Sequence, residues 1–156
     1  MNPRCMPLLL LVSLALVFTG CSSTGKKKPE TAKPPAGSLK DQSGDVSFQA
    51  FVSRLRKAVA AKDKATLATM MTPNFGYSWD ADGEGAGVFD YWDANNLWPE
   101  VQAVLREKFV PNDNYMVAPA EVTFNADYVG YFAGLRLERG SWRFAYFVPA
   151  PLPSTH

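Results

Sequence analysis

Residues 128–148 read YVGYFAGLRLERGSWRFAYFV, and this stretch decides the predicted fold. In its first half, apolar side chains alternate with others over positions 129–137, the period-two pattern of a strand with one buried face. Arg139-Gly140 can form a tight turn. The returning segment alternates in the same way, through Trp142, Phe144, Tyr146 and Val148. The stretch therefore predicts an antiparallel hairpin, which the prolines from residue 149 onward end.

Further strands are predicted on the N-terminal side of this hairpin. Tyr115–Ala118 and Glu121–Phe124 are short candidates. Upstream, Phe75, Tyr77 and Trp79 alternate with small residues, which predicts that the three rings share one face of a strand. A Gly-rich turn and a weaker strand are expected to follow by residue 89.

Helical spacing predicts two helices between residues 47 and 72. Ser47 can cap the first. Its apolar stripe is formed by Phe48, Phe51, Val52, Leu55 and Val59. Asp63 is the expected cap of the second helix, whose buried face is Leu67, Met70 and Met71 and which ends at Thr72-Pro73.

A third helical region spans about residues 88–109 and contains Pro99. Because proline removes a backbone donor and strains the preceding turn, we expect a break near Asn95-Asn96 and a restart at Trp98-Pro99. The apolar face beyond the break is Val101, Val104, Leu105 and Phe109.

These elements predict an α+β domain, with N-terminal helices packed on a curved, mostly antiparallel sheet. The chain has 156 residues, a length typical of one domain with accessory segments. All but one of its aromatic residues lie beyond residue 46. We therefore place a single α+β domain at residues 47–156.

Residues 1–20 are predicted to be a signal peptide. Arg4 precedes an apolar run over residues 7–19, which is shorter than the roughly 20 residues that span a bilayer. The sequence Phe18-Thr19-Gly20-Cys21 resembles a bacterial lipobox. That resemblance implies that Cys21 becomes the acylated first residue of the mature chain and anchors it in a lipid bilayer. In lipoproteins of Gram-negative bacteria, an Asp directly after the cysteine commonly marks retention in the inner membrane. Ser22 occupies that position here, so the resemblance implies the outer membrane and a domain that faces the periplasm if the source is Gram-negative.

Residues 21–46 are expected to form the lipidated cysteine and a disordered tether. Gly, Ser, Pro, Thr and Lys dominate residues 22–46, and only four positions there are apolar. Such a segment cannot bury enough apolar surface to offset its conformational entropy. Lys26, Lys27 and Lys28 could contact anionic lipid or cell wall, or could simply be solvated.

The composition excludes several kinds of chemistry. The single histidine is the last residue, His156, and the only cysteine besides Cys21 is Cys5, inside the signal peptide. These positions argue against Ser-His-Asp and Cys-His catalysis and against zinc or haem sites. A net charge of +1 gives no electrostatic case for nucleic acid. No phosphate-binding or dinucleotide motif is present, so we expect no cofactor.

Five carboxylates between residues 80 and 93 form the densest polar cluster: Asp80, Asp82, Glu84, Asp90 and Asp93. They could hold a hard cation or supply an acid/base pair, or they could form a solvated acidic turn. Residues 80–85 resemble the start of an EF-hand loop, but Tyr91 occupies the place of its bidentate Glu. We therefore predict no metal site and assign no catalytic residue.

The aromatic residues near this cluster suggest a binding pocket. Most aromatics on strands fill a core, but Trp and Tyr also line many small-molecule and glycan sites. The candidate pocket residues are Tyr77, Trp79, Asp80, Asp90, Tyr91 and Trp92. If they line a pocket, Tyr77, Trp79 and Trp92 are expected to be partly exposed.

The order of elements resembles the nuclear transport factor 2-like (cystatin-like cone) superfamily over roughly residues 47–149. The resemblance rests on residues 58–67, which are similar to the family's paired opening helices, on Thr72-Pro73-Asn74-Phe75, and on the final hairpin at Gly140-Ser141-Trp142-Arg143-Phe144. It implies a sheet curled around a pocket, in a superfamily that includes isomerases, dehydratases, cyclases and non-catalytic binding domains.

We therefore expect a membrane-tethered lipoprotein of the cell envelope with a non-enzymatic domain that binds a small ligand or an envelope protein. One alternative is a small isomerase or lyase that uses an Asp and a Tyr. Another is a purely structural envelope protein. A pocket deeply lined by Tyr77, Trp79 or Trp92 with a buried Asp would favour the first two functions, and a closed, aromatic-filled cone would favour the third.

Overall fold

The computed structural model describes residues 39–151 and has the predicted α+β class. The helices are α1 (Val46–Ala60), α2 (Lys64–Met70), α3 (Val88–Ala94), α4 (Trp98–Arg106) and the short 3-10 helix η1 (Ala120–Thr123). The strands are β1 (Met71–Gly76), β2 (Val110–Asn112), β3 (Tyr115–Ala118), β4 (Tyr131–Glu138) and β5 (Ser141–Pro149). The predicted signal peptide, Cys21, most of the tether and His156 lie outside the described residues.

The predicted hairpin forms the centre of a five-stranded sheet with the order β1-β5-β4-β3-β2. All neighbouring strands are antiparallel except β1 and β5, which are parallel. Arg139 and Gly140 connect β4 to β5 with φ of +49° and +79°, as a type I′ turn requires. The antiparallel hairpin predicted from residues 128–148 is therefore confirmed, and so is the mostly antiparallel sheet.

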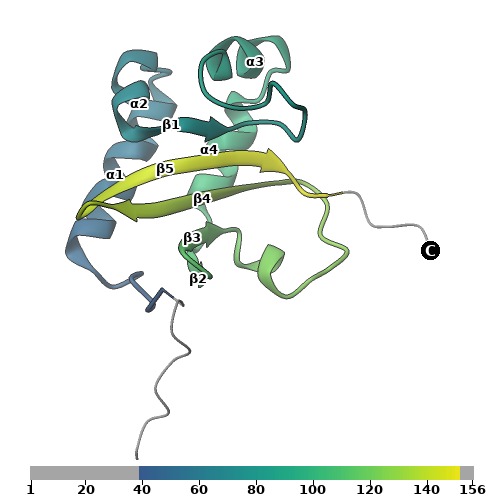
Figure 1. Ribbon diagram of the computed structural model, residues 1–156. Coiled ribbons are helices and arrows are strands. Elements are labelled where there is room, and N and C mark those ends of the chain that lie inside the picture. The colour runs from purple at the N-terminus through teal and green to yellow at the C-terminus, as the bar shows by residue number, and fades with distance from the viewer. Residues whose placement is uncertain (1–38, 152–156) are drawn as a thin grey trace, which may run out of the picture. The chain divides into compact units, whose positions relative to one another are not determined.

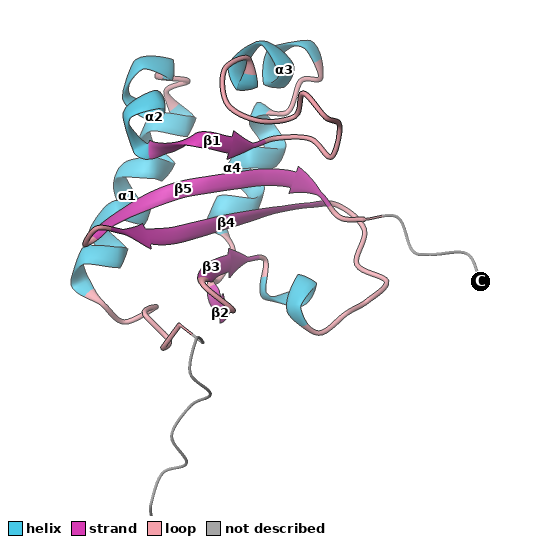
Figure 2. Cartoon of the chain, in the orientation of Figure 1, coloured by secondary structure: helices cyan, strands magenta, loops and turns pink. Residues whose placement is uncertain are grey.

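The helices and the sheet form two layers around one core. Figure 2 shows α1 and α4 passing behind β4 and β5, while the side of the sheet that faces the viewer carries no helix. Leu55 of α1 and Leu105 of α4 are fully buried together with Leu135 and Phe144 of the sheet. We call the uncovered side the helix-free face.

A β-bulge at Ala145 changes which side chains reach the core. Gly134 pairs with Tyr146 and Leu135 pairs with Phe144, so Ala145 is an extra residue in β5. Beyond the bulge, Phe147 joins the core and Tyr146 turns to the helix-free face. The predicted inward row is right for Trp142 and Phe144 and wrong for Tyr146 and Val148, which both line the helix-free face.

The domain begins earlier than residue 47. Asp45 is the N-cap of α1 and its carboxylate accepts a hydrogen bond from Phe48 N at 3.0 Å, so the prediction that Ser47 caps this helix is wrong. Leu39 packs against the core, and its backbone N–H donates to the carbonyl of Asp113 at 2.8 Å. Residues 39–46 therefore belong to the folded domain and not to the tether.

The other helices follow the sequence pattern except at their ends: α2 ends at Met70, so Met71 begins β1, and α4 ends at Arg106, so Phe109 lies beyond it. Asp63 caps α2 by accepting a hydrogen bond from Thr66 N at 3.0 Å. The break before Pro99 separates α3 from α4, and Asn96 in the gap has a positive φ. The four apolar residues predicted beyond the break are buried.

Three strand predictions are wrong. The weaker strand expected by residue 89 is only an isolated bridge between Glu84 and Gly76, and α3 begins at Val88. β1 spans Met71–Gly76, so it begins directly after α2 and ends before Trp79. It tolerates Pro73 because it is an edge strand. Residues 120–123 form η1 instead of a strand, because β3 already has β2 and β4 as neighbours and leaves no partner for another strand.

The space between helices and sheet is filled with aromatic side chains. Trp92 lies edge-to-face with Trp98, Phe75 and Phe147, at ring-centroid distances of 5.1, 6.0 and 5.8 Å. Phe48 packs in the same manner on Trp142 at 4.8 Å. The interior that the cone resemblance predicts as a pocket is thus occupied by the protein's own side chains.

Candidate functional site

A cleft of about 360 Å³ lies on the helix-free face, a volume within the range of small-molecule sites. We call it the sheet cleft. Its aromatic lining consists of Trp79, Tyr115, Phe132 and Tyr146. Its polar lining includes Asn74, Ser78, Glu84 and Arg136. The sheet cleft therefore combines flat apolar surfaces with several hydrogen-bonding groups.

Tyr146 forms the floor of the sheet cleft because two glycines leave room for its ring. A Cβ atom on Gly134 would lie only 2.1 Å from Tyr146 Cζ, and one on Gly76 would lie 3.3 Å from Tyr146 Cβ. The Tyr146 ring packs edge-to-face on Phe132 and Tyr115, at 5.4 and 5.2 Å between ring centroids. Glycine at position 134 is thus a steric requirement of this floor.

Trp79 forms one wall of the sheet cleft. Its side chain is exposed, with 62% of its surface accessible, yet its indole Nε1–H donates to the carbonyl of Pro149 at 2.7 Å. The Trp79 ring lies 6.5 Å from Phe132, with their planes tilted by 37°. A large ring is therefore held in solvent at a fixed orientation.

Burial raises the pKa of Tyr146 well above its ordinary value. Its hydroxyl consequently stays protonated at neutral pH and can donate a hydrogen bond, but it is a poor general base. Glu84 is the carboxylate that lines the sheet cleft, and it is exposed. The sheet cleft is therefore better suited to binding a ligand by hydrogen bonds than to transferring protons.

Of the six candidate pocket residues, only Trp79 lines the sheet cleft. Tyr77 is buried, and its hydroxyl donates to the carbonyl of Asp82 at 2.7 Å. Trp92 is fully buried in the core. The expectation that Tyr77 and Trp92 are partly exposed is wrong, because the chain leaves the sheet after Gly76 and the three predicted rings do not share a face.

Tyr91, Asp80 and Asp90 also lie apart from the sheet cleft. Tyr91 is half-buried, with its ring 5.2 Å from that of Tyr77. Asp80 accepts a hydrogen bond from Ser78 Oγ at 2.6 Å within its own turn, and Asp90 is exposed in the first turn of α3. Among residues 39–151, no group of three or more His, Cys, Asp or Glu is placed to hold a metal ion.

The sequence pattern missed Tyr115, Phe132, Tyr146 and Arg136. Phe132 and Arg136 lie in β4 at the positions between the predicted core residues. The alternating pattern therefore predicts that they face away from the core, but it does not predict that they line a cleft. Glycine in the middle of a strand often marks the close approach of another group. Gly134 is therefore the one sequence signal that could have located this floor.

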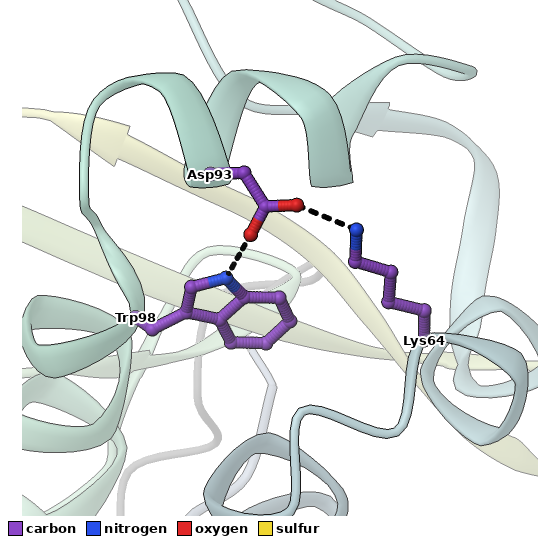
Figure 3. A network of polar contacts seen from close by, with 3 residues as sticks. All are labelled: Lys64, Asp93 and Trp98. Carbon is purple, nitrogen blue, oxygen red and sulfur yellow. Dashed lines mark hydrogen bonds and ion pairs between the residues drawn. The ribbon is translucent and has the colours of Figure 1, made fainter.

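Asp93 links three helices away from the sheet cleft (Figure 3). Its carboxylate contacts Lys64 Nζ of α2 at 2.6 Å and accepts a hydrogen bond from Trp98 Nε1 of α4 at 2.7 Å. The hydrogen bonds from Lys64 and Trp98 hold the pKa of Asp93 below its ordinary value. Asp93 therefore has a structural role and is not part of a binding site.

These contacts predict that the domain loses stability in acid. The lowered pKa values of Asp93, Asp63 and Asp45 mean that the folded state favours their ionised forms. Their contribution is present above the unfolded pKa of about 4 and is lost as the pH falls through the lower folded values. Thermal melts from pH 7 down to about 2.5 should show this decline, with a shallower slope for Asp93→Asn. An unchanged slope in that variant would contradict the role given to Asp93.

In the described part of the chain, no helix is long and apolar enough to cross a membrane. Comparison with protein-family models, curated proteins and solved structures finds no significant match to this chain. The lipobox and the cone resemblance therefore remain predictions from the sequence.

Proposed function

We propose that this protein is a lipid-anchored protein of the cell envelope whose domain binds a ligand in the sheet cleft without catalysing a reaction. The anchor is acylated Cys21, as the lipobox resemblance implies. The proposed ligand is a polar molecule with flat ring faces, such as a cell-wall glycan.

Trp79 is the observation that carries this proposal. An exposed tryptophan whose indole is held by a hydrogen bond to Pro149 offers a stacking surface that is already in place before binding. Such preorganisation lowers the entropic cost of association. Asn74, Ser78 and Glu84 supply donors and acceptors next to this surface, as a sugar ring with hydroxyl groups at its edge requires.

The alternatives have less support. The enzyme alternative uses an Asp and a Tyr in one site, whereas Asp80 and Asp90 lie outside the sheet cleft. The carboxylate that does line it, Glu84, is exposed, and the pKa of Tyr146 is raised. The aromatic-filled interior is what a purely structural envelope protein would have. That role becomes the preferred function if the sheet cleft binds nothing.

Binding can be tested on a fragment of residues 34–156. The chain divides at residue 34, and the part beyond it holds every described element and one continuous core, so this fragment is expected to fold by itself. The probes are the tetramer of N-acetylglucosamine and sonicated peptidoglycan, measured by calorimetry and by co-sedimentation. Trp79→Ala is expected to weaken binding at least about tenfold, because it removes a preformed stacking surface.

Phe124→Ala is the matched control for this measurement, since Phe124 is an exposed aromatic residue that does not line the sheet cleft. It should bind like the parent. If the parent binds neither probe, the glycan proposal fails. If both variants bind equally well, the sheet cleft is not the site.

Anchoring at Cys21 gives a separate prediction. In the full chain, Cys21→Ala removes the sulfur that would carry the diacylglycerol, so the protein should move from the detergent-soluble membrane fraction to the soluble or unprocessed precursor pool. Cell fractionation and metabolic labelling with a fatty acid measure this change, with Cys5→Ala as the control. Equal labelling of the Cys21 variant and the parent would overturn the anchor assignment.

A further inference from the structure

Two adjoining hollows lie at the turn end of the β4–β5 hairpin, away from Trp79. The first, of about 600 Å³, is lined by α1, α2 and the start of β5 and includes Arg54, Lys57 and Arg143. The second, of about 820 Å³, is lined by β1 and the hairpin and includes Arg136, Arg139 and Arg143. Both contain Ser141 and Arg143, so together they form one continuous region, which we call the basic surface.

The positive charge of the basic surface is largely unbalanced. Five cationic side chains line it against two carboxylates, Asp63, which caps α2, and Glu138, which pairs with Arg136. Within residues 39–151, the ion pairs are Lys64–Asp93 and Arg136–Glu138, so none involves Arg54, Lys57, Arg139 or Arg143. From residue 47 onward the chain carries more acidic than basic residues, so this positive concentration is local.

Two features of this region disfavour the folded state on their own. Arg136 and Arg143 are directly opposite each other on β4 and β5, and like charges in that arrangement are destabilising. The ion pair of Arg136 with Glu138 and the hydrogen bond from Arg143 to the Thr69 carbonyl offset this cost only in part. Arg139 has a φ of +49°, a conformation that Asn or Gly adopts more readily in a type I′ turn. An anion bound by the two guanidinium groups would offset the first cost. Binding of the same anion by Arg139 would account for an arginine in this strained turn position.

We propose that the basic surface binds a ligand with at least two phosphate groups, on one molecule or on neighbouring lipids. Guanidinium groups match phosphate oxygens with paired, charge-assisted hydrogen bonds. Each hollow has cations of its own, and Arg143 lines both, so the proposed ligand places one phosphate in each hollow. The second hollow shares Asn74 and Arg136 with the sheet cleft. The variants that test the basic surface are therefore placed at Arg54 and Arg139, which do not line the sheet cleft.

Calorimetric titration of the fragment 34–156 with sodium tripolyphosphate tests the proposal. The double variant Arg54→Gln/Arg139→Asn removes one charge from each hollow and should weaken binding at least about tenfold. Parent binding should also weaken as sodium chloride is raised. Arg106→Gln, which removes a charge outside both hollows, should bind like the parent.

Folding does not confound this test. Asn is well suited to the turn position that Arg139 occupies, so Arg139→Asn alone should melt at the same temperature as the parent or higher. If the parent binds neither tripolyphosphate nor anionic vesicles, or if the double variant binds as tightly as the parent, the proposal is wrong.

Vesicles of phosphatidylcholine, with or without phosphatidylglycerol, distinguish the sources of the phosphate. Co-sedimentation that requires phosphatidylglycerol and is lost in the double variant identifies bilayer headgroups as the ligand. Binding of tripolyphosphate without vesicle binding identifies a soluble or polymeric phosphate. Either result supports phosphate binding at the basic surface, and neither result depends on Trp79.

Discussion

A Trp92→Ala variant is expected to lose about 3–5 kcal/mol of unfolding free energy, because it leaves a large cavity in the core. Trp92 is fully buried and packs on rings from β1, β5 and α4. A domain of this size is stable by about 5–15 kcal/mol in total. The melting temperature of the fragment 34–156 should therefore fall by about 10–30 °C, which a thermal melt followed by circular dichroism measures.

Trp79→Ala is the matched comparison, since it removes the same side chain from an exposed position. This variant loses the hydrogen bond to Pro149 and the contact with Phe132, so the expected loss is only about 1 kcal/mol. If the two variants were equally destabilised, Trp79 would be a core residue and the proposed stacking role would fail.

A Gly134→Ala variant is expected to remove the floor of the sheet cleft. The added methyl group would overlap the Tyr146 ring, since the nearest ring atom would lie 2.1 Å away. Forcing an extra methyl group into a packed site costs about 1–3 kcal/mol, and the displaced ring would change the shape of the sheet cleft. Denaturant unfolding and glycan titration of the same preparation measure both effects.

Two controls separate the effect of the overlap with the Tyr146 ring from the other effects of adding a methyl group. Gly44→Ala adds the same methyl group where no atom lies within 4 Å, so its stability should match that of the parent. Adding Tyr146→Ala to Gly134→Ala removes the overlapping ring, so the two changes should be clearly non-additive. Additive losses would show that Gly134 and Tyr146 do not interact as described.

The sequence patterns that predicted the fold are those set by a single buried face. The helical stripe through Leu55 and the hairpin through Leu135 and Phe144 each face one core, so their periodicity reports burial directly. Pro99 and Asp63 act locally, through a missing donor and a capping carboxylate, and they mark helix boundaries correctly.

The sheet cleft depends on features that periodicity does not encode. The extra residue Ala145 moves Tyr146 from the predicted core row to the helix-free face, because a one-residue shift exchanges the two faces of a strand. Trp79 reaches the sheet cleft from a loop that has left the sheet, through a hydrogen bond to Pro149, which is 70 residues away in the chain. Contacts of this range follow from the folded topology and not from local sequence.

The place of β5 in the sheet also constrains when the chain can fold. β5 follows the other described strands in the chain, yet it lies between β1 and β4, with Phe144 paired to Met71 on one side and to Leu135 on the other. Until it emerges, β1 has no partner strand and Phe75 has no Phe144 ring to pack on. Closing such a long loop is slow compared with forming local helices, so folding of the domain is completed only when β5 is available. β5 is therefore the strand that closes the domain, and the core stays open on the β1 side until this strand has paired with both of its neighbours.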